Sequence, residues 1–171
     1  LRQYMQNPKT NESNLRNLSR FLYRVSHNYR RLISYQAEMV DLTALNVIPQ
    51  IDFTEDAHDD EKIKTSYFNT LVQLDKMNMQ SEILKCLLIA WREDTFYGYT
   101  YEDDSGFFIY PLDGDYCKVS SVNYDGTLNC AFDFSYFRSH TADLEYWDSE
   151  FNSKYNSFQS DNTLRWRELD P

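Results

Sequence analysis

The sequence predicts an α+β fold: a long N-terminal helix and two or three further helices packed against a small antiparallel sheet of two consecutive β-hairpins. All four glycines of the 171 residues lie within 91–137, where short blocks rich in Tyr, Phe, Val and Thr are separated by turn residues. Outside this stretch, apolar residues recur at steps of three and four, as they do along one face of a helix. The connections between the expected strands are too short for crossover helices, so we expect no parallel sheet.

Two turn signals define the hairpins. The first hairpin, 95–112, turns at Asp103-Asp104-Ser105-Gly106, and the second, 119–134, turns at Asp125-Gly126. The Asp-Gly pair is a strong hairpin signal because both central residues of a type I′ turn need a positive φ.

The N-terminal third predicts a leader and one long helix. Residues 1–14 are polar and contain Pro8, which is typical of a flexible leader. From Leu15 to Val40 the apolar residues keep to one helical face. Four arginines recur on the opposite face, and we call them the arginine stripe: Arg16, Arg20, Arg24 and Arg31.

The arginine stripe has two interpretations. Segment 1–42 carries seven basic and three acidic residues, a net charge of +4 in a chain whose net charge is −10. A stripe of this kind is commonly the solvated face of a helix. It is also a candidate subunit interface that meets the acidic surface of a neighbour, such as the carboxylates of 52–61 or 93–115.

Further helices are expected at 63–77, 79–93 and 144–158. The tail after Asn162 is expected to be a strand or a loop. An extended segment at 44–53 precedes the first of them. The helix 79–93 is the candidate for a central buried helix, with the Cys86 thiol reduced and inaccessible. The expected core residues are Leu22, Val25, Tyr29, Ile83, Leu87, Leu88 and Trp91.

Composition narrows the classes of function. A length of 171 residues is enough for one domain with its own core, so we expect a single domain over 1–171. The 27 acidic against 17 basic residues argue against a general nucleic-acid-binding surface and against binding to anionic membranes. No stretch approaches the length of an apolar membrane span. The first residue is Leu1, from which we expect a fragment of a longer chain.

Residues that could carry chemistry form no recognisable site. The acidic segment 52–61 contains His58 but lacks the glycine of a calcium loop and the spacing of a zinc motif, so we expect no metal. The carboxylates of 93–115 could in principle act as acid and base, yet most lie at turns, where Asp suits the backbone. Cys86, Cys117 and Cys130 read as free thiols. We expect no catalytic residues, no cofactor and no enzymatic activity.

Three stretches carry a resemblance to a known family. They are NYRRLISYQAEMV at 28–40, LLIAWREDTFYGY at 87–99 and GFFIYPLDGDYCKVSSVNYDGTLNCAFDFSYF at 106–137. In this order, an arginine-bearing helix, a helix leading into a hairpin and a second hairpin around a DG turn resemble the N-terminal wing region of tailed-bacteriophage portal proteins, the head–tail connectors. The resemblance covers about residues 15–137.

The resemblance implies a structural role in the virion. Portal proteins form an oligomeric ring, usually a dodecamer, at one capsid vertex, and double-stranded DNA is packaged and ejected through it without sequence-specific binding. It implies that copies of this chain contact one another, and that the partners are capsid, terminase and tail-connector proteins. The expected location is the portal vertex of the virion, and the host cytoplasm during capsid assembly. The alternative from the residues alone is a small acidic intracellular binding module or enzyme of unknown chemistry.

Overall fold

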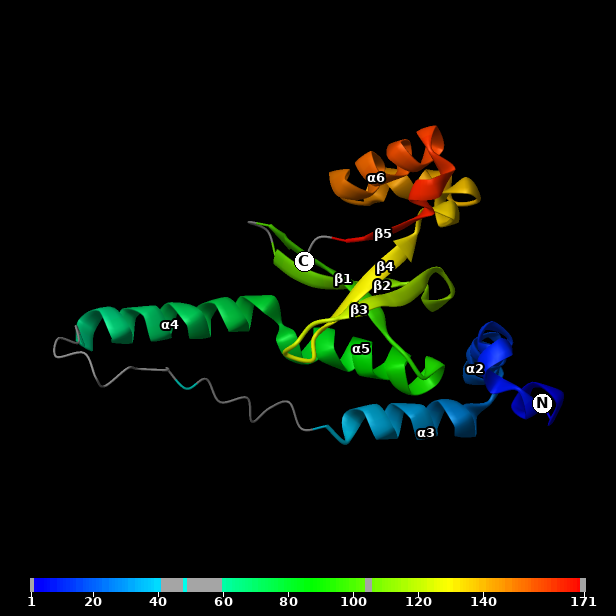
Figure 1. Ribbon diagram of the computed structural model, residues 1–171. Helices are drawn as coiled ribbons and strands as arrows, with labels where there is room; N and C mark the ends of the chain where they lie inside the picture. Colours follow the sequence, from blue (N-terminus) through cyan, green and yellow to red (C-terminus); the bar gives the residue numbers. More distant parts are fainter. Residues whose placement is uncertain (1, 41–47, 49–59, 104–105, 170–171) are drawn as a thin grey trace. The chain divides into compact units, whose positions relative to one another are not determined.

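The computed structural model describes residues 2–40, 48, 60–103 and 106–169, and it confirms the α+β class (Figure 1). The chain divides into two compact units, 1–110 and 111–171, which we describe separately. The predicted single domain stays a prediction, since two compact units can still unfold as one cooperative domain.

Unit 1 is mainly helical. Its described elements are α1 (Arg2–Gln6), η1 (Pro8–Thr10), α2 (Glu12–Val25), α3 (His27–Glu38), α4 (Asp60–Met77), α5 (Met79–Glu93), β1 (Tyr97–Asp103) and β2 (Gly106–Leu112), the last of which runs two residues into unit 2. Helices α2, α3 and α5 pack on one another, and β1 and β2 form a two-stranded hairpin. The segment expected as a flexible leader contains α1, η1 and the start of α2.

The predicted long helix 15–40 is wrong as one element, because Ser26 divides it into α2 and α3. The backbone of Ser26 is extended, with φ −101° and ψ 111°, so the helical hydrogen-bond pattern stops there. Its side-chain oxygen accepts a hydrogen bond from the backbone N–H of Tyr29 at 3.3 Å, which caps the first turn of α3.

The boundary between α4 and α5 agrees with the prediction. Asn78 takes a left-handed conformation, with φ 47° and ψ 44°, and separates the two helices. The carboxylate of Glu82 on α5 then accepts a hydrogen bond from the backbone N–H of Ile109 at 2.7 Å, which fastens β2 to α5. Within β1, Gly98 allows close packing, because a Cβ there would lie 2.8 Å from the Cγ2 atom of Ile109. Except for Ile48, the predicted segment 44–53 lies outside the described residues, as do residues 52–59 of the acidic segment and residues 104–105 of the first turn.

The predicted core of unit 1 is wrong in part. Trp91 and Val25 are about half exposed. In the last turn of α5 it is Glu93, two positions after Trp91 and therefore on the opposite side of the helix, that is buried. The other five expected core residues are half-buried. Among the described residues of unit 1, the buried ones are Ile33, Ala37 and Glu93.

Unit 2 is a three-stranded antiparallel sheet with short helices at one end. After η2 (Gly114–Tyr116), its elements are β3 (Cys117–Val122), β4 (Leu128–Asp133), η3 (Phe134–Arg138), η4 (Thr141–Tyr146), α6 (Ser149–Ser160), η5 (Asn162–Arg165) and β5 (Trp166–Glu168). The strand order is β3-β4-β5. The two hairpins therefore belong to two separate sheets, and the C-terminal tail supplies the third strand of the second one.

The best-packed core of the protein lies in unit 2 and is aromatic. Phe132 on β4 contacts the rings of Phe134, Phe137, Trp147 and Phe151, with centroids 5.5–6.0 Å apart. The predicted helix 144–158 is wrong at its start, because Leu144 lies in η4 and α6 begins at Ser149, after the N-cap Asp148. Its apolar face is confirmed on α6, where three residues are buried: Phe151, Tyr155 and Phe158.

The second hairpin has a different turn from the one expected. The N–H of Gly126 donates to the carbonyl of Asn123 at 3.0 Å, so the turn spans 123–126 with Tyr124 and Asp125 at its centre. Gly126 has φ 86°, whereas Asp125 is not among the described residues with positive φ. This is a turn followed by one left-handed glycine, and the Asp125 side chain closes it by accepting from the N–H of Thr127 at 3.0 Å.

Candidate interaction surface

A group of polar side chains holds α2 against α5. The Nη2 atom of Arg20 lies 2.5 Å from Oε2 of Glu93, whose other oxygen accepts hydrogen bonds from Arg92. Arg92 also stacks over the ring of Tyr23, at 5.4 Å from its centroid. Ser19 donates to the backbone carbonyl of Arg92. We call Ser19, Arg20, Tyr23, Arg92 and Glu93 the polar clamp.

The polar clamp also reaches α3. Arg30 stacks over Tyr23 at 5.7 Å from the ring centroid, and its Nε donates to the carbonyl of Tyr23 at 3.0 Å. The hydroxyls of Ser19 and Tyr29 lie 2.9 Å apart. Three helices are therefore joined through polar groups at the point where α2 ends and α3 begins.

Glu93 remains charged although it is buried. Burial raises the pKa of this carboxyl, but hydrogen bonds from Arg20 and Arg92 outweigh burial and hold the pKa below its ordinary value of 4.5. Arg20 comes from α2 and Arg92 from α5, so the buried Glu93 carboxylate joins the two helices, and loss of either arginine would leave it with a single cationic partner.

The structure separates the four residues of the arginine stripe. Arg20 is part of the polar clamp, so its carboxylate partner is Glu93 of the same chain. The Arg16 side chain is 13% exposed and lies 3.8 Å from Glu12. Arg24 on α2 and Arg31 on α3 are exposed. A subunit contact through the whole stripe stays a prediction, and Arg24 and Arg31 are the members whose side chains are most open to solvent.

Apolar side chains form a ridge on α3 that sequence reasoning missed. Leu32, Tyr35 and Met39 recur at helical steps and are 53%, 64% and 68% exposed. They lie on the side of α3 away from the buried Ile33 and Ala37. We call these three residues the α3 ridge. The prediction placed Leu32 and Met39 on one apolar face with Ile33, but in the structure only Ile33 of these three is buried.

Helix α2 shows the same arrangement on a smaller scale. Phe21 and Val25, one turn apart, are 58% and 60% exposed, while Ser19, Arg20 and Tyr23 carry the contacts with α5. An amphipathic helix normally buries its apolar side. In α2, polar side chains make much of the contact with α5, whereas Phe21 and Val25 face solvent.

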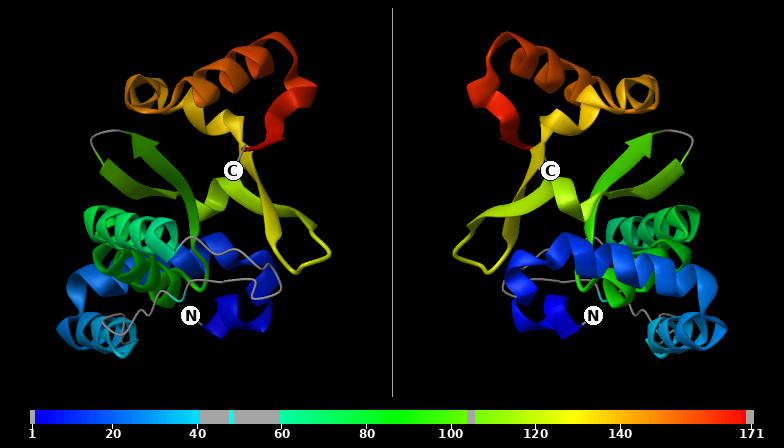
Figure 2. Two further views of the ribbon diagram at one scale, coloured as in Figure 1. Left: turned by 90° about the vertical axis from the view of Figure 1, so that its left-hand side faces the viewer. Right: turned by 90° about the vertical axis from the view of Figure 1, so that its right-hand side faces the viewer.

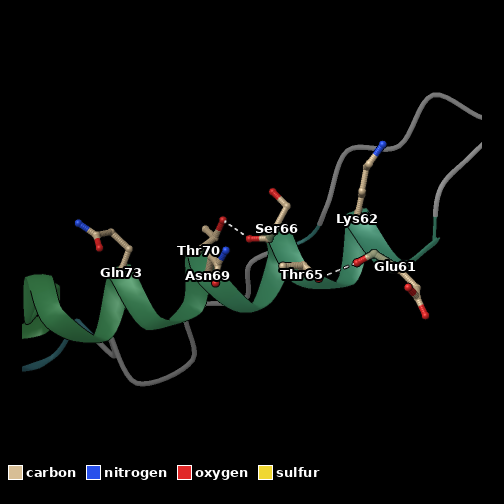
Figure 3. Close-up of a pocket in the computed structure, with 7 residues that line it drawn as sticks. All are labelled: Glu61, Lys62, Thr65, Ser66, Asn69, Thr70 and Gln73. Atoms are coloured by element: carbon tan, nitrogen blue, oxygen red, sulfur yellow. Dashed lines mark hydrogen bonds between the residues drawn. The ribbon is translucent and has the colours of Figure 1, made fainter.

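A hollow runs along α4. Figure 3 shows its polar lining: Glu61, Lys62, Thr65, Ser66, Asn69, Thr70 and Gln73. The hydroxyls of Thr65 and Thr70 donate to backbone carbonyls one turn earlier, at 2.8 and 2.9 Å. These hydroxyls are therefore engaged by the helix itself, and the lining residues include no histidine or cysteine that could act as a base or a thiol nucleophile.

Several of the carboxylates considered for chemistry have structural roles. Asp113 caps η2 through the N–H of Asp115 at 3.1 Å, and Glu93 belongs to the polar clamp. Within the described parts of the chain, no three His, Cys, Asp or Glu residues come close enough to hold a metal ion. Cys86, Cys117 and Cys130 are half-buried and form no disulfide, and burial raises the pKa of the Cys86 and Cys130 thiols.

Comparison with known protein families, with curated proteins and with solved structures finds no match for this chain. In the described helices there is no segment long and apolar enough to cross a membrane. The features that the structure does bring together are the polar clamp and the exposed apolar surfaces on α2 and α3. This arrangement is suited to contact with another protein surface.

Proposed function

We propose that this chain is a structural subunit of a phage portal ring, in which it forms the wing region. In this role it takes part in packaging double-stranded DNA into the capsid and ejecting it, as part of an assembly and without catalysis of its own. Its neighbours are other copies of the same protein, and its further partners are capsid, terminase and tail-connector proteins.

The observation that carries the proposal is the α3 ridge together with Phe21 and Val25 on α2. Contiguous exposed apolar side chains commonly mark a protein–protein contact. These residues lie on helices held by the polar clamp, so the surface is presented in a fixed form and needs little ordering on binding.

Charge supports contact between unlike surfaces of neighbouring copies. Segment 12–38 contains five arginines and two glutamates, a net charge of +3, in a chain with a net charge of −10. Two copies of this basic surface would repel each other, whereas it attracts the acidic remainder of a neighbour. Head-to-tail contacts of this type form rings when the rotation between neighbouring copies closes.

The acidic balance is also compatible with a DNA conduit. A ring whose surface is negatively charged repels phosphate and does not hold the duplex by counterion release. DNA can then move past it without the binding that a basic protein would impose.

Electron microscopy of the complete protein and of phage particles tests the proposal. Purified protein should form closed rings, and gold-labelled antibody against residues 12–38 should mark one vertex per disrupted capsid. An antibody against the major capsid protein is the control and should label the whole shell. Monomeric protein that is absent from purified particles would support the small binding module or enzyme instead.

A further inference from the structure

The β3–β4 hairpin of unit 2 extends beyond the core that supports its base. Strand β5 pairs with β4 only at 131–133, so the outer part of the hairpin has two strands. In Figure 2 this part, drawn in yellow, runs away from α6 and ends in the turn at 123–126. We call residues 119–130 the arm.

An irregularity in the arm places its apolar residues on one face. The pairing of β3 with β4 shifts between Val119 and Ser121, so Ser120 is an extra residue. Its hydroxyl donates to the carbonyl of Asn129 at 3.0 Å and so fastens the bulge. Because of this extra residue, Val122 points to the same side of the sheet as Val119, although the two are three positions apart.

The apolar face of the arm continues the core face of the sheet. Val119 pairs with Cys130 and Val122 with Leu128, while the same face of β4 leads inward to Phe132. Phe132 is buried, whereas Val119, Leu128 and Val122 are 42%, 58% and 64% exposed. We call these three exposed residues the arm face.

The opposite side of the arm is polar and already hydrogen-bonded. Asn129 donates to the side chains of Ser121 and Asn123 at 2.9 and 3.1 Å. A two-stranded ribbon is marginally stable in water by itself. The polar side is satisfied, so the arm face is the side that gains from being covered.

We propose that the arm face of one copy docks on the α3 ridge of a neighbouring copy. The inference rests on the proposed function, because it requires copies of the chain to meet in an assembly. Both surfaces consist of three exposed apolar residues. Leu32 to Met39 spans about 10 Å along a helix, and Val119 to Val122 about 10 Å along a strand.

Charge favours the same pairing. The α3 ridge is flanked by the exposed Arg31, and the turn of the arm carries the exposed Asp125 beside the fully exposed Tyr124. The two surfaces are different, so their contact is heterologous. A contact between two copies leaves the ridge of one copy and the arm of the other free for further copies, and repetition gives a closed ring when the rotation from one copy to the next closes.

Photo-crosslinking in the complete protein tests the docking. Tyr124 is replaced by the photoreactive residue p-benzoylphenylalanine, and copies labelled with ¹⁵N are mixed with unlabelled copies before illumination. Mass spectrometry should find residue 124 joined to residues 32–39, in peptide pairs of mixed isotope content. The matched control carries the same photoreactive residue at Tyr146, which is also an exposed tyrosine of unit 2, and should give no crosslink to 32–39.

Two substitutions sharpen the test. Val122→Asp on the arm and Tyr35→Asp on the ridge should each lower the yield of the mixed crosslink about tenfold, the change expected for a central apolar contact. Tyr146→Asp should leave it unchanged. Crosslinks from residue 124 to other surfaces, or only within one chain, would overturn the docking.

Electron microscopy of the same samples separates the two proposals. Rings in which residue 124 crosslinks elsewhere would overturn the docking and leave the proposed function standing. Mixed crosslinks to 32–39 without closed rings would support the docking and overturn the ring. Absence of both rings and crosslinks would overturn both.

Discussion

Arg20 and Glu93 form an ion pair across 2.5 Å although they lie 73 positions apart in the sequence. This pair joins the middle of α2 to the last residue of α5 and sets how the basic helix is presented. The sequence leaves two interpretations for Arg20, a solvated helix face or a contact with a neighbouring subunit. Arg20 instead contacts its own chain, because the buried Glu93 needs cationic partners.

Arg20→Gln should lower the free energy of unfolding by about 1–3 kcal/mol, since Glu93 stays buried with Arg92 as its remaining cationic partner. Urea unfolding followed by far-UV circular dichroism measures the change. Arg24→Gln is the matched control on the same helix and should change stability by less than about 0.5 kcal/mol, because Arg24 is exposed. Equal effects of the two substitutions would show that the ion pair adds nothing to stability.

Stability should fall in acid as the buried carboxylates take up protons. Burial raises the pKa of Glu93 and of Asp133, but hydrogen bonds from their arginine partners outweigh it, so both folded-state pKa values lie below the ordinary 4.5 and 3.8. The stabilisation that these two carboxylates contribute is complete at pH values above their ordinary pKa values. It is lost as the pH falls through their lower folded-state pKa values. The Glu93→Gln variant should be less stable at neutral pH and should lose less on acidification. The measurement is the free energy of unfolding as a function of pH, and parallel curves for wild type and variant would contradict this prediction.

Asp133→Asn should destabilise unit 2 by about 2–4 kcal/mol. The Asp133 carboxylate is buried, accepts from the guanidinium of Arg165 at 2.6–3.0 Å and caps η3 through the N–H of Ser135 at 2.9 Å. Near-UV circular dichroism of the aromatic core during thermal unfolding reports the loss. Glu145→Gln, at an exposed position, is the control and should leave the midpoint of thermal unfolding unchanged. If Glu145→Gln lowered the midpoint as much as Asp133→Asn, Asp133 would have no specific role.

Ser26→Ala should cost about 1 kcal/mol, because the N–H of Tyr29 loses the side-chain oxygen that caps α3. Chemical denaturation measures it. Asn28→Ala, two residues later at an exposed position, should cause no loss. If Ser26→Ala were neutral, the direction of α3 would be set by the polar clamp alone.

Arg24→Glu combined with Arg31→Glu should slow assembly of the complete protein and leave its helix content unchanged. Exposed ion pairs contribute only about 0–1 kcal/mol each, so their main effect is on the rate and register of association. Light scattering during assembly and circular dichroism test the two parts. Lys64→Glu combined with Lys76→Glu on α4 alters the net charge equally and serves as the control. Unchanged assembly kinetics would mean that these arginines are only a solvated face.

The sequence by itself determined the elements whose signals are local. The α4–α5 boundary at Asn78, both hairpins and the buried face of α6 follow from apolar periodicity and turn residues, which act over a few positions. Only the tertiary structure decided features that depend on residues far apart. The partner of Arg20, the aromatic core around Phe132 and the pairing of Asp133 with Arg165 require segments that meet only on folding. The side to which Val122 points depends on a one-residue shift in strand pairing. The end of α2 at Ser26 is a local feature, but a serine within an apolar helical pattern does not by itself show that the helix stops there. Periodicity shows which residues are apolar, but burial depends on which surfaces the folded chain brings together.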